Sequence, residues 1–149
     1  MKTDLTVSAY IIKDNKTLLV DHVLTGLWLP PGGHIDKNET PDKALLREIR
    51  QELGLEIKIL NTPEIPKEGN IIDNLAVPFY CNTHMLIDHI HYCAFYVCEL
   101  LTNKISISKR ELKGFEWFSK QELYNKKVPA DVRNIGLLAF NKYEELKLK

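Results

Sequence analysis

The first third of the chain alternates between apolar segments that predict strands and polar segments that predict turns. β-Branched and aromatic residues, which favour strands, are concentrated in residues 5–12 and 17–23. Residues 13–16 between them have the polar composition of a hairpin turn. Residues 27–33 follow with two prolines and two glycines, so we expect a rigid, shaped loop there.

The clearest helix is predicted at residues 41–53. Thr40 is suited to cap its amino end and Pro41 to occupy its first position, while Gly54 supplies a left-handed stop. On a helical wheel, one stripe of this helix is apolar and faces the core, a basic side faces water, and the remaining flank is acidic. The apolar stripe consists of Leu45, Ile49 and Leu53. The basic side consists of Lys43, Arg47 and Arg50, and the acidic flank of Glu48, Gln51 and Glu52.

The rest of the chain predicts further strands and a helical end. Four segments have strand-like composition: residues 56–60, 76–80, 89–101 and 114–118. Residues 61–75, with two prolines and a glycine, predict a long loop. Ser119 and Glu122 form a capping-box pair that opens a short helix, and Asp131 is placed to cap a longer one. Strands mixed with a few helices are typical of an α+β or mixed α/β fold.

Composition predicts one domain over residues 1–149, because the length matches a typical domain and no repeat or linker divides the chain. Twenty basic and twenty acidic residues give a formal net charge of zero, which argues against general nucleic-acid binding and against a polybasic membrane anchor. No apolar run is long enough to span a bilayer. The cysteines are odd in number and lack a CxxC pair, so we expect a reduced, cytoplasmic protein in which they are buried strand residues. They are Cys81, Cys93 and Cys98.

The acidic flank of the predicted helix carries the candidate chemistry. Glu48 and Glu52 are four residues apart, so they lie side by side on the helix and repel each other unless a cation compensates them. Oxygen ligands without histidine or cysteine favour Mg²⁺ over zinc, and Glu39 is a further carboxylate nearby. A solvated acidic face is the ordinary explanation of such a pair. Here, however, a glycine–proline loop precedes the helix, and its backbone could approach both metal and phosphate.

The spacing of these residues resembles the signature box of the Nudix hydrolases, Gx5Ex7REUxEExGU, in which U is a bulky aliphatic residue. From Gly33 to Leu55 the chain reads GHIDKNETPDKALLREIRQELGL and matches eight of the nine specified positions. The resemblance implies an α/β/α sandwich with a central mixed β-sheet. The exception is Gln51, which stands where the family usually has the first glutamate of its pair. It removes a negative charge from a position that often ligates metal in relatives. Fewer metals, weaker metal binding, a compensating carboxylate and lost catalysis all remain open.

The resemblance also implies a catalytic arrangement. Enzymes of this family hydrolyse a nucleoside diphosphate linked to another moiety, using Mg²⁺, with Mn²⁺ able to replace it, to neutralise phosphates and activate water. The implied metal ligands are Glu48, Gln51, Glu52 and the Gly32 carbonyl. Arg47 would orient a carboxylate of the site, Glu48 being the first candidate. Glu39 would be either structural or a hydrogen-bond partner of the residues that bind metal. Glu111 is the candidate general base, ahead of Glu116.

Substrate contacts are less sharply indicated. Trp28, Gly33 and His34 are the candidates, because an aromatic ring stacks on a base and the glycine–histidine pair could meet a phosphate. Phe79 and Tyr80 are further aromatic candidates. His89 and His91 lie two apart on one strand face, but no third ligand follows at zinc-like spacing, which favours packing or surface positions. Substrate choice is expected to depend on residues 61–75 and 82–88, taken as loops.

Two functions follow from these residues and the resemblance. The first is a divalent-metal-dependent hydrolase that cleaves the pyrophosphate linkage of a nucleotide sugar, an ADP-ribose-like compound or a nucleoside triphosphate. The second is a catalytically weakened or inactive module that binds and senses a nucleotide or metabolite, with Gln51 as the trace of lost catalysis. The expected partner is a small-molecule nucleotide or nucleotide conjugate, and the sensor could also bind another metabolite. The resemblance leaves a homodimer open, since relatives are often dimers.

Overall fold

Strand β1 (Thr3–Lys13) occupies the middle of the sheet in this computed structural model, which describes residues 2–148. Along one edge β1 pairs in parallel with β7 (His89–Leu100). Along the other it pairs antiparallel with β2 (Lys16–His22) at one end and with β4 (Gly32–His34) nearer the other. This arrangement places the glycines of β4 against the backbone of the central strand.

The remaining strands flank this centre. They are β3 (Trp28–Leu29) and β8 (Leu112–Ser119), which pair with β2, and β5 (Ile57–Ile59) and β6 (Tyr80–Leu86), which pair with β7. Within residues 2–148, the β1–β7 pair is parallel and every other strand pair is antiparallel. The sheet is therefore mixed, as the resemblance implied.

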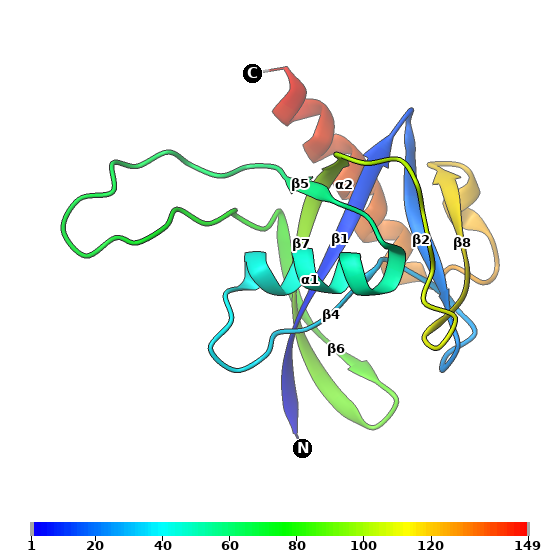
Figure 1. The fold of residues 1–149 in the computed structure, drawn as a ribbon. Helices are drawn as coiled ribbons and strands as arrows, with labels where there is room; N and C mark the ends of the chain where they lie inside the picture. Colours follow the sequence, from blue (N-terminus) through cyan, green and yellow to red (C-terminus); the bar gives the residue numbers. More distant parts are fainter. Residues whose placement is uncertain (1, 149) are drawn as a thin grey trace.

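Helices α1 (Pro41–Leu53) and α2 (Ala130–Lys147) cover opposite faces of this sheet (Figure 1). The alternation of β1 explains why both faces need a cover. Val7 and Ile11 are buried in the cluster beneath α1, whereas Tyr10 is buried in the cluster beneath α2. The predicted α/β/α sandwich is confirmed.

Helix α1 forms over the residues that its sequence signals predict. The Thr40 hydroxyl accepts a hydrogen bond from the Lys43 amide at 3.2 Å. Gly54 ends the helix with a φ of 65°, and its amide donates to the Arg50 carbonyl. The predicted apolar stripe is fully buried against the sheet: Leu45, Ile49 and Leu53. Burial of this stripe fixes which way the acidic flank points.

Two predicted boundaries in the middle of the chain are wrong. Residues 27–33 are not a plain loop, because they contain β3 and part of β4 on either side of the two prolines. Residues 76–79 are not a strand, and β6 instead runs through residues 80–86, most of the segment expected to be a loop. Since β6 pairs on one edge only and is largely exposed, its sequence lacks the apolar alternation that identifies inner strands. Cys81 is exposed for the same reason, contrary to expectation.

The carboxyl-terminal helices differ from prediction at their starts. The Ser119–Glu122 capping box is present as two reciprocal hydrogen bonds, but it opens only a single 3₁₀ turn, η1 (Glu122–Tyr124). Asp131 lies inside the first turn of α2 rather than capping it, because the helix already begins after Pro129. Across residues 2–148, no helix has the length and apolar character needed to cross a membrane.

Candidate active site

The site is built where β4 meets α1, at two glycines that allow unusually close contacts. A Cβ atom on Gly32 would lie 2.0 Å from the Val7 carbonyl oxygen, so the pairing of β4 with β1 requires glycine there. A Cβ atom on Gly33 would lie 2.4 Å from the Glu48 carboxyl carbon. The second glycine therefore leaves room for a carboxylate of α1 against the β4 backbone.

Glu52 is the most deeply buried carboxylate that the structure describes, with 3% of the residue exposed. Its Oε1 accepts a hydrogen bond from the Gly32 amide at 3.3 Å. The pKa of Glu52 is raised to about 8, mainly by burial and also by the charges of Glu48 and Glu111, while the hydrogen bond from Gly32 acts in the opposite direction. A cation close to this buried carboxylate would stabilise its charged form.

Glu48 shares the site one helical turn earlier. Burial raises the pKa of Glu48, and the charges of Glu111 and Asp36 act in the same direction, while the contact with Arg47 opposes them. Glu48, Glu52 and Glu111 all line one cleft. Three carboxylates that face a common space form an oxygen-rich set that suits a hard divalent cation.

Arg47 is half-buried beside this carboxylate group, and it does not face open water as the helical wheel predicted. Its Nε and Nη2 donate to the two oxygens of Glu39 at 2.8 and 2.9 Å, and its Nη1 donates to Glu48 at 2.7 Å. Its Nη2 also donates to the His34 carbonyl at 2.9 Å. The hydrogen bonds from Arg47 lower the pKa of Glu39 to about 2. The guanidinium thus ties the loop before α1 to a carboxylate of the site.

Comparison with known sequences places these residues in a family. The sequence model described as the NUDIX domain matches residues 2–138. The chain belongs to the NUDIX family. The box carried by β4 and α1 is therefore the Nudix box, seen in its folded form.

Three Nudix relatives illustrate the likeness. The 8-oxo-dGTP diphosphatase of Proteus vulgaris is 37% identical over 62 residues, which cover 38% of this chain and 55% of the relative. The ADP-ribose pyrophosphatase of Methanocaldococcus jannaschii is 33% identical over 75 residues, which cover 44% of each chain. The alignments thus span about half the length of these curated relatives. A NUDIX-family hydrolase from Clostridium perfringens has a crystal structure that superimposes with a TM-score of 0.83 at 26% identity, covering 96% of this chain and 99% of that one.

The cleft of this Nudix fold has a volume of about 580 Å³ and two kinds of wall. The Nudix box supplies the polar wall, in which the predicted residues Gly32, Gly33 and His34 join the three carboxylates. Apolar residues before and on β3 and on β6 supply the other: Leu24, Leu27, Leu29, Met85 and Leu86. A cleft with both an apolar and a charged wall suits a ligand with a ring system and phosphates.

Other predicted residues lie away from this cleft. The ring of Trp28 packs on Phe118 with centroids 5.3 Å apart, and Trp28 is not among the residues that line the cleft. Phe79 and Tyr80 likewise pack on neighbouring aromatic rings. Gln51 is exposed outside the cleft, where its Oε1 accepts a hydrogen bond from Arg47 at 3.3 Å.

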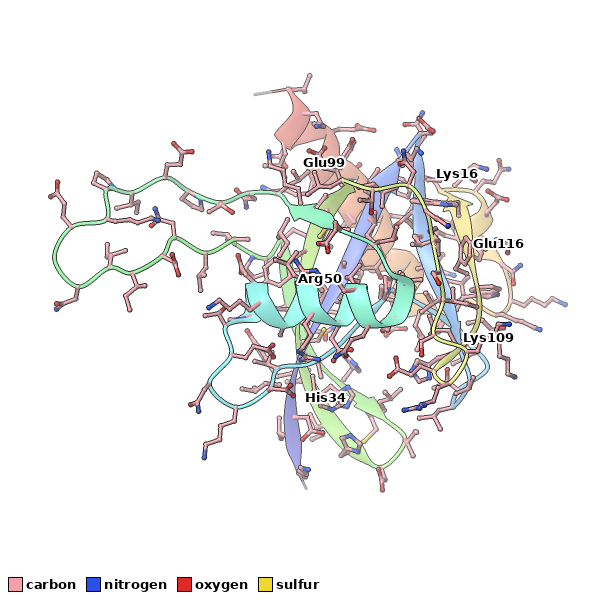
Figure 2. All side chains as sticks on the ribbon, in the orientation of Figure 1. Lys16, His34, Arg50, Glu99, Lys109 and Glu116 are labelled. Carbon is pink, nitrogen blue, oxygen red and sulfur yellow. The ribbon has the colours of Figure 1, made fainter. Side chains whose placement is uncertain are left out.

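The sequence did not indicate that histidines gather at one end of the cleft. His84 and His91 line it together with His34. Figure 2 shows His34 beneath α1, on the side of the β6–β7 hairpin, whereas Arg50 lies on α1 itself. His89 and His91 had been assigned to packing or the surface because no further ligand follows them in sequence. The fold brings Asp4 of β1 and His34 of β4 beside them, which linear spacing cannot show.

Proposed function

We propose that this chain is a divalent-metal-dependent hydrolase that cleaves the pyrophosphate linkage of a nucleoside diphosphate joined to another moiety. The observation that carries the proposal is the convergence of Glu48, Glu52 and Glu111 on one cleft, with Glu52 almost fully buried. A buried carboxylate beside two others is costly unless a cation joins them. A purely structural helix has no need for that arrangement.

The carboxylates fit a magnesium ion. Glu48, Glu52 and Glu111 would hold it, since all three are oxygen donors on the cleft. When bound, Mg²⁺ would neutralise phosphate charge and lower the pKa of a water molecule. Gln51 lies outside the cleft, so its lost charge is compensated by Glu111 from the segment before β8 rather than by a neighbour on the helix.

The chain's own residues have separate tasks in this proposal. Arg47 holds Glu48 in place through its 2.7 Å hydrogen bond and is itself fixed by Glu39. Gly33 lets the backbone of β4 lie directly against the Glu48 carboxylate, because it has no side chain there. Glu111 would complete the carboxylate set and accept a proton from the attacking water, which is supported by its position on the cleft.

The substrate class is a small nucleotide or nucleotide conjugate. The apolar leucine wall suits a base or sugar, and the carboxylate wall suits metal-bound phosphates. Relatives named as an 8-oxo-dGTP diphosphatase and an ADP-ribose pyrophosphatase support substrates with a phosphoanhydride bond. Nucleoside triphosphates, nucleotide sugars and ADP-ribose are therefore the compounds to test.

The test is product release from that panel with and without Mg²⁺, using wild type and matched glutamine variants. Glu52→Gln and Glu111→Gln should each abolish or strongly reduce turnover. Glu116→Gln, on the exposed part of β8 outside the cleft, should retain it. Metal-independent turnover, or equal turnover in all variants, would contradict the proposal.

A non-catalytic sensor is the second candidate, and the observation that favours it is Gln51 in place of glutamate. Tight nucleotide binding without turnover of any compound in the panel would support it. In that case Gln51→Glu should leave the protein inactive as well. If instead Gln51→Glu raises turnover, the site is a working catalyst with a weakened metal position.

A further inference from the structure

A second group of ligand-type side chains lies near the amino-terminal ends of β1 and β7 and the carboxyl-terminal end of β4. Asp4 of β1, His34 of β4, and His89 and His91 of β7 each offer one ligand atom, and these four atoms all lie within 4.8 Å of one another. Asp4 Oδ2 is 3.2 Å from both His34 Nε2 and His89 Nε2. The Nε2 atoms of His89 and His91 are 3.1 Å apart.

Sheet register, not sequence spacing, assembles the group. Asp4 is the parallel partner of His91, and His89 lies two residues earlier on the same face of β7. His34 reaches the group from β4, whose register places it opposite Thr6 of β1. The four side chains therefore come from three strands that are already fixed by backbone hydrogen bonds.

The contacts around His89 are difficult to satisfy with neutral imidazoles alone. Its Nδ1 lies 2.9 Å from a carboxylate oxygen of Asp88, which can only accept a hydrogen bond, so Nδ1 must carry the proton. A neutral His89 then presents a bare Nε2 lone pair to the carboxylate of Asp4. A cation between the Asp4 carboxylate and this nitrogen would satisfy both lone pairs.

We propose that Asp4, His34, His89 and His91 form a transition-metal site for a cation of the Zn²⁺ class, separate from the carboxylate site. Three imidazoles and one carboxylate supply the four ligands of a closed, tetrahedral zinc site. The Asp88 carboxylate on His89 Nδ1 matches the outer carboxylate that commonly orients a metal-bound histidine. His91 is buried, whereas His34 is exposed, so an ion can enter from solvent.

The surroundings of His91 disfavour a second proton on its ring. Burial lowers the pKa of His91, and the neighbouring His34, His84 and His89 lower it further, while Asp4 acts in the opposite direction. Bound metal would cross-link β1, β4 and β7 at one end of the cleft. It would thereby fix His34, the residue that follows Gly33 in the Nudix box. The site does not depend on the proposed hydrolase activity.

A proton is the competing occupant. A doubly protonated His89 would donate to Asp4 and Asp88 at the same time and satisfy both carboxylates without any metal. The two explanations differ in what the chelator-treated protein binds. A site made of Asp4 and the histidines takes up Zn²⁺ in excess Mg²⁺ and loses it when Asp4 or His34 is replaced, whereas a protonated group takes up none.

The experiment titrates chelator-treated full chain with Zn²⁺ in excess Mg²⁺, by calorimetry and by melting temperature. We expect a single Zn²⁺ ion per chain and a raised melting temperature. Asp4→Asn and His34→Ala should each weaken Zn²⁺ binding by more than about tenfold, the lower end of what even an outer partner of a ligand costs. His22→Ala, a histidine outside the group, and Glu52→Gln should bind Zn²⁺ as the wild type does.

Cobalt gives an independent readout, because Co²⁺ in a tetrahedral site absorbs visible light far more strongly than in an octahedral one. We expect the strong spectrum in wild type and its loss in Asp4→Asn. No Zn²⁺ uptake in excess Mg²⁺ would overturn the proposal in favour of the proton. So would a weak octahedral Co²⁺ spectrum, or Zn²⁺ binding that survives Asp4→Asn and His34→Ala but is lost in Glu52→Gln.

Discussion

Glu52 links the site to the stability of the metal-free protein. Its folded-state pKa of about 8 lies above the ordinary glutamate value of 4.5, so as the pH rises between these values the unfolded chain releases this proton before the folded one does. The metal-free protein therefore loses stability across this window. A bound cation would reverse that effect by stabilising the charged form. The same burial that destabilises the metal-free chain would thus favour metal binding.

Glu52→Gln should accordingly stabilise the chelator-treated protein at pH 8 by about 2–8 °C in melting temperature. The gain should shrink towards pH 5, where Glu52 is protonated in the folded wild type as well. Melting curves of both proteins at the two pH values, without metal, measure this. A variant that melts lower than wild type at pH 8 would show that the charge of Glu52 is already compensated by the protein.

Arg47 positions a carboxylate through a geometry that lysine cannot reproduce. Its guanidinium donates to Glu39 through two nitrogens and to Glu48 through a third, whereas a lysine ammonium is a point charge. Arg47→Lys should lower kcat/KM by about 10–100-fold while the melting temperature falls only slightly. The matched control is Arg50→Lys on the same helix, where the arginine pairs with exposed Glu56 away from the cleft. Equal losses in both variants would contradict a positioning role for Arg47.

At the scale of elements, the short strand β4 combines a structural glycine with a functional one. A Cβ on Gly32 would meet backbone of β1, which cannot move away, whereas a Cβ on Gly33 would meet only the Glu48 side chain. Gly32→Ala should therefore destabilise the fold by about 1–3 kcal/mol. Gly33→Ala should instead displace Glu48 and remove most activity with little change in melting temperature.

Gly114→Ala is the control for this pair, since nothing lies within 4 Å of a Cβ placed on that strand residue. Melting curves and turnover of the three alanine variants provide the measurement. We expect Gly114→Ala to match wild type in both. If Gly33→Ala melts as low as Gly32→Ala, the second glycine is also structural.

Local signals in the sequence predicted α1 and its neighbours well. The cap at Thr40, the stop at Gly54 and the apolar stripe are properties of adjacent residues, and the structure contains all three. The exposed strand β6 had no such signal, because half of its pairing surface faces solvent. Local composition predicted the outer strands β5 and β8, but it failed where strand residues are as polar as those of β6.

Contacts between distant residues were the part of the site that sequence could not predict. The resemblance indicated Glu48 and Glu52, but the wheel placed Arg47 in water, whereas residues of the preceding loop surround it. The histidine group depends on the register between β1, β4 and β7, which no short window of sequence contains. Trp28 shows the converse. Its aromatic ring made it a candidate for stacking on a substrate base, but in the structure the ring packs on Phe118.

At the scale of the whole molecule, only one of the two segments expected to govern substrate choice lies at the cleft. Residues 82–86 belong to β6 and contribute His84, Met85 and Leu86 to the cleft. Residues 61–75 project as a long arm away from the sheet (Figure 1) and line no part of the cleft. Several apolar side chains on the arm are exposed, including Ile65 and Ile72.

Replacing residues 63–74 with a short glycine–serine linker should leave both the melting temperature and kcat/KM close to wild type. The arm is anchored at its base, where the Ala76 amide donates to Asp42 at 3.1 Å, and that contact remains. Thermal melts and steady-state kinetics at several protein concentrations are the measurement. A concentration-dependent loss of activity would instead reveal that the arm acts in a second copy of the chain.

The parallel pairing of β1 with β7 has a consequence for how the chain reaches this structure. Partners from Thr3/Ile90 to Ile11/Cys98 are 87 residues apart in sequence, and they form the centre of the sheet. During synthesis, the whole of α1 therefore leaves the ribosome before the strand that completes the sheet beneath it exists. Folding must close this long loop before the core can form, which slows it and leaves β1 exposed to aggregation in the nascent chain.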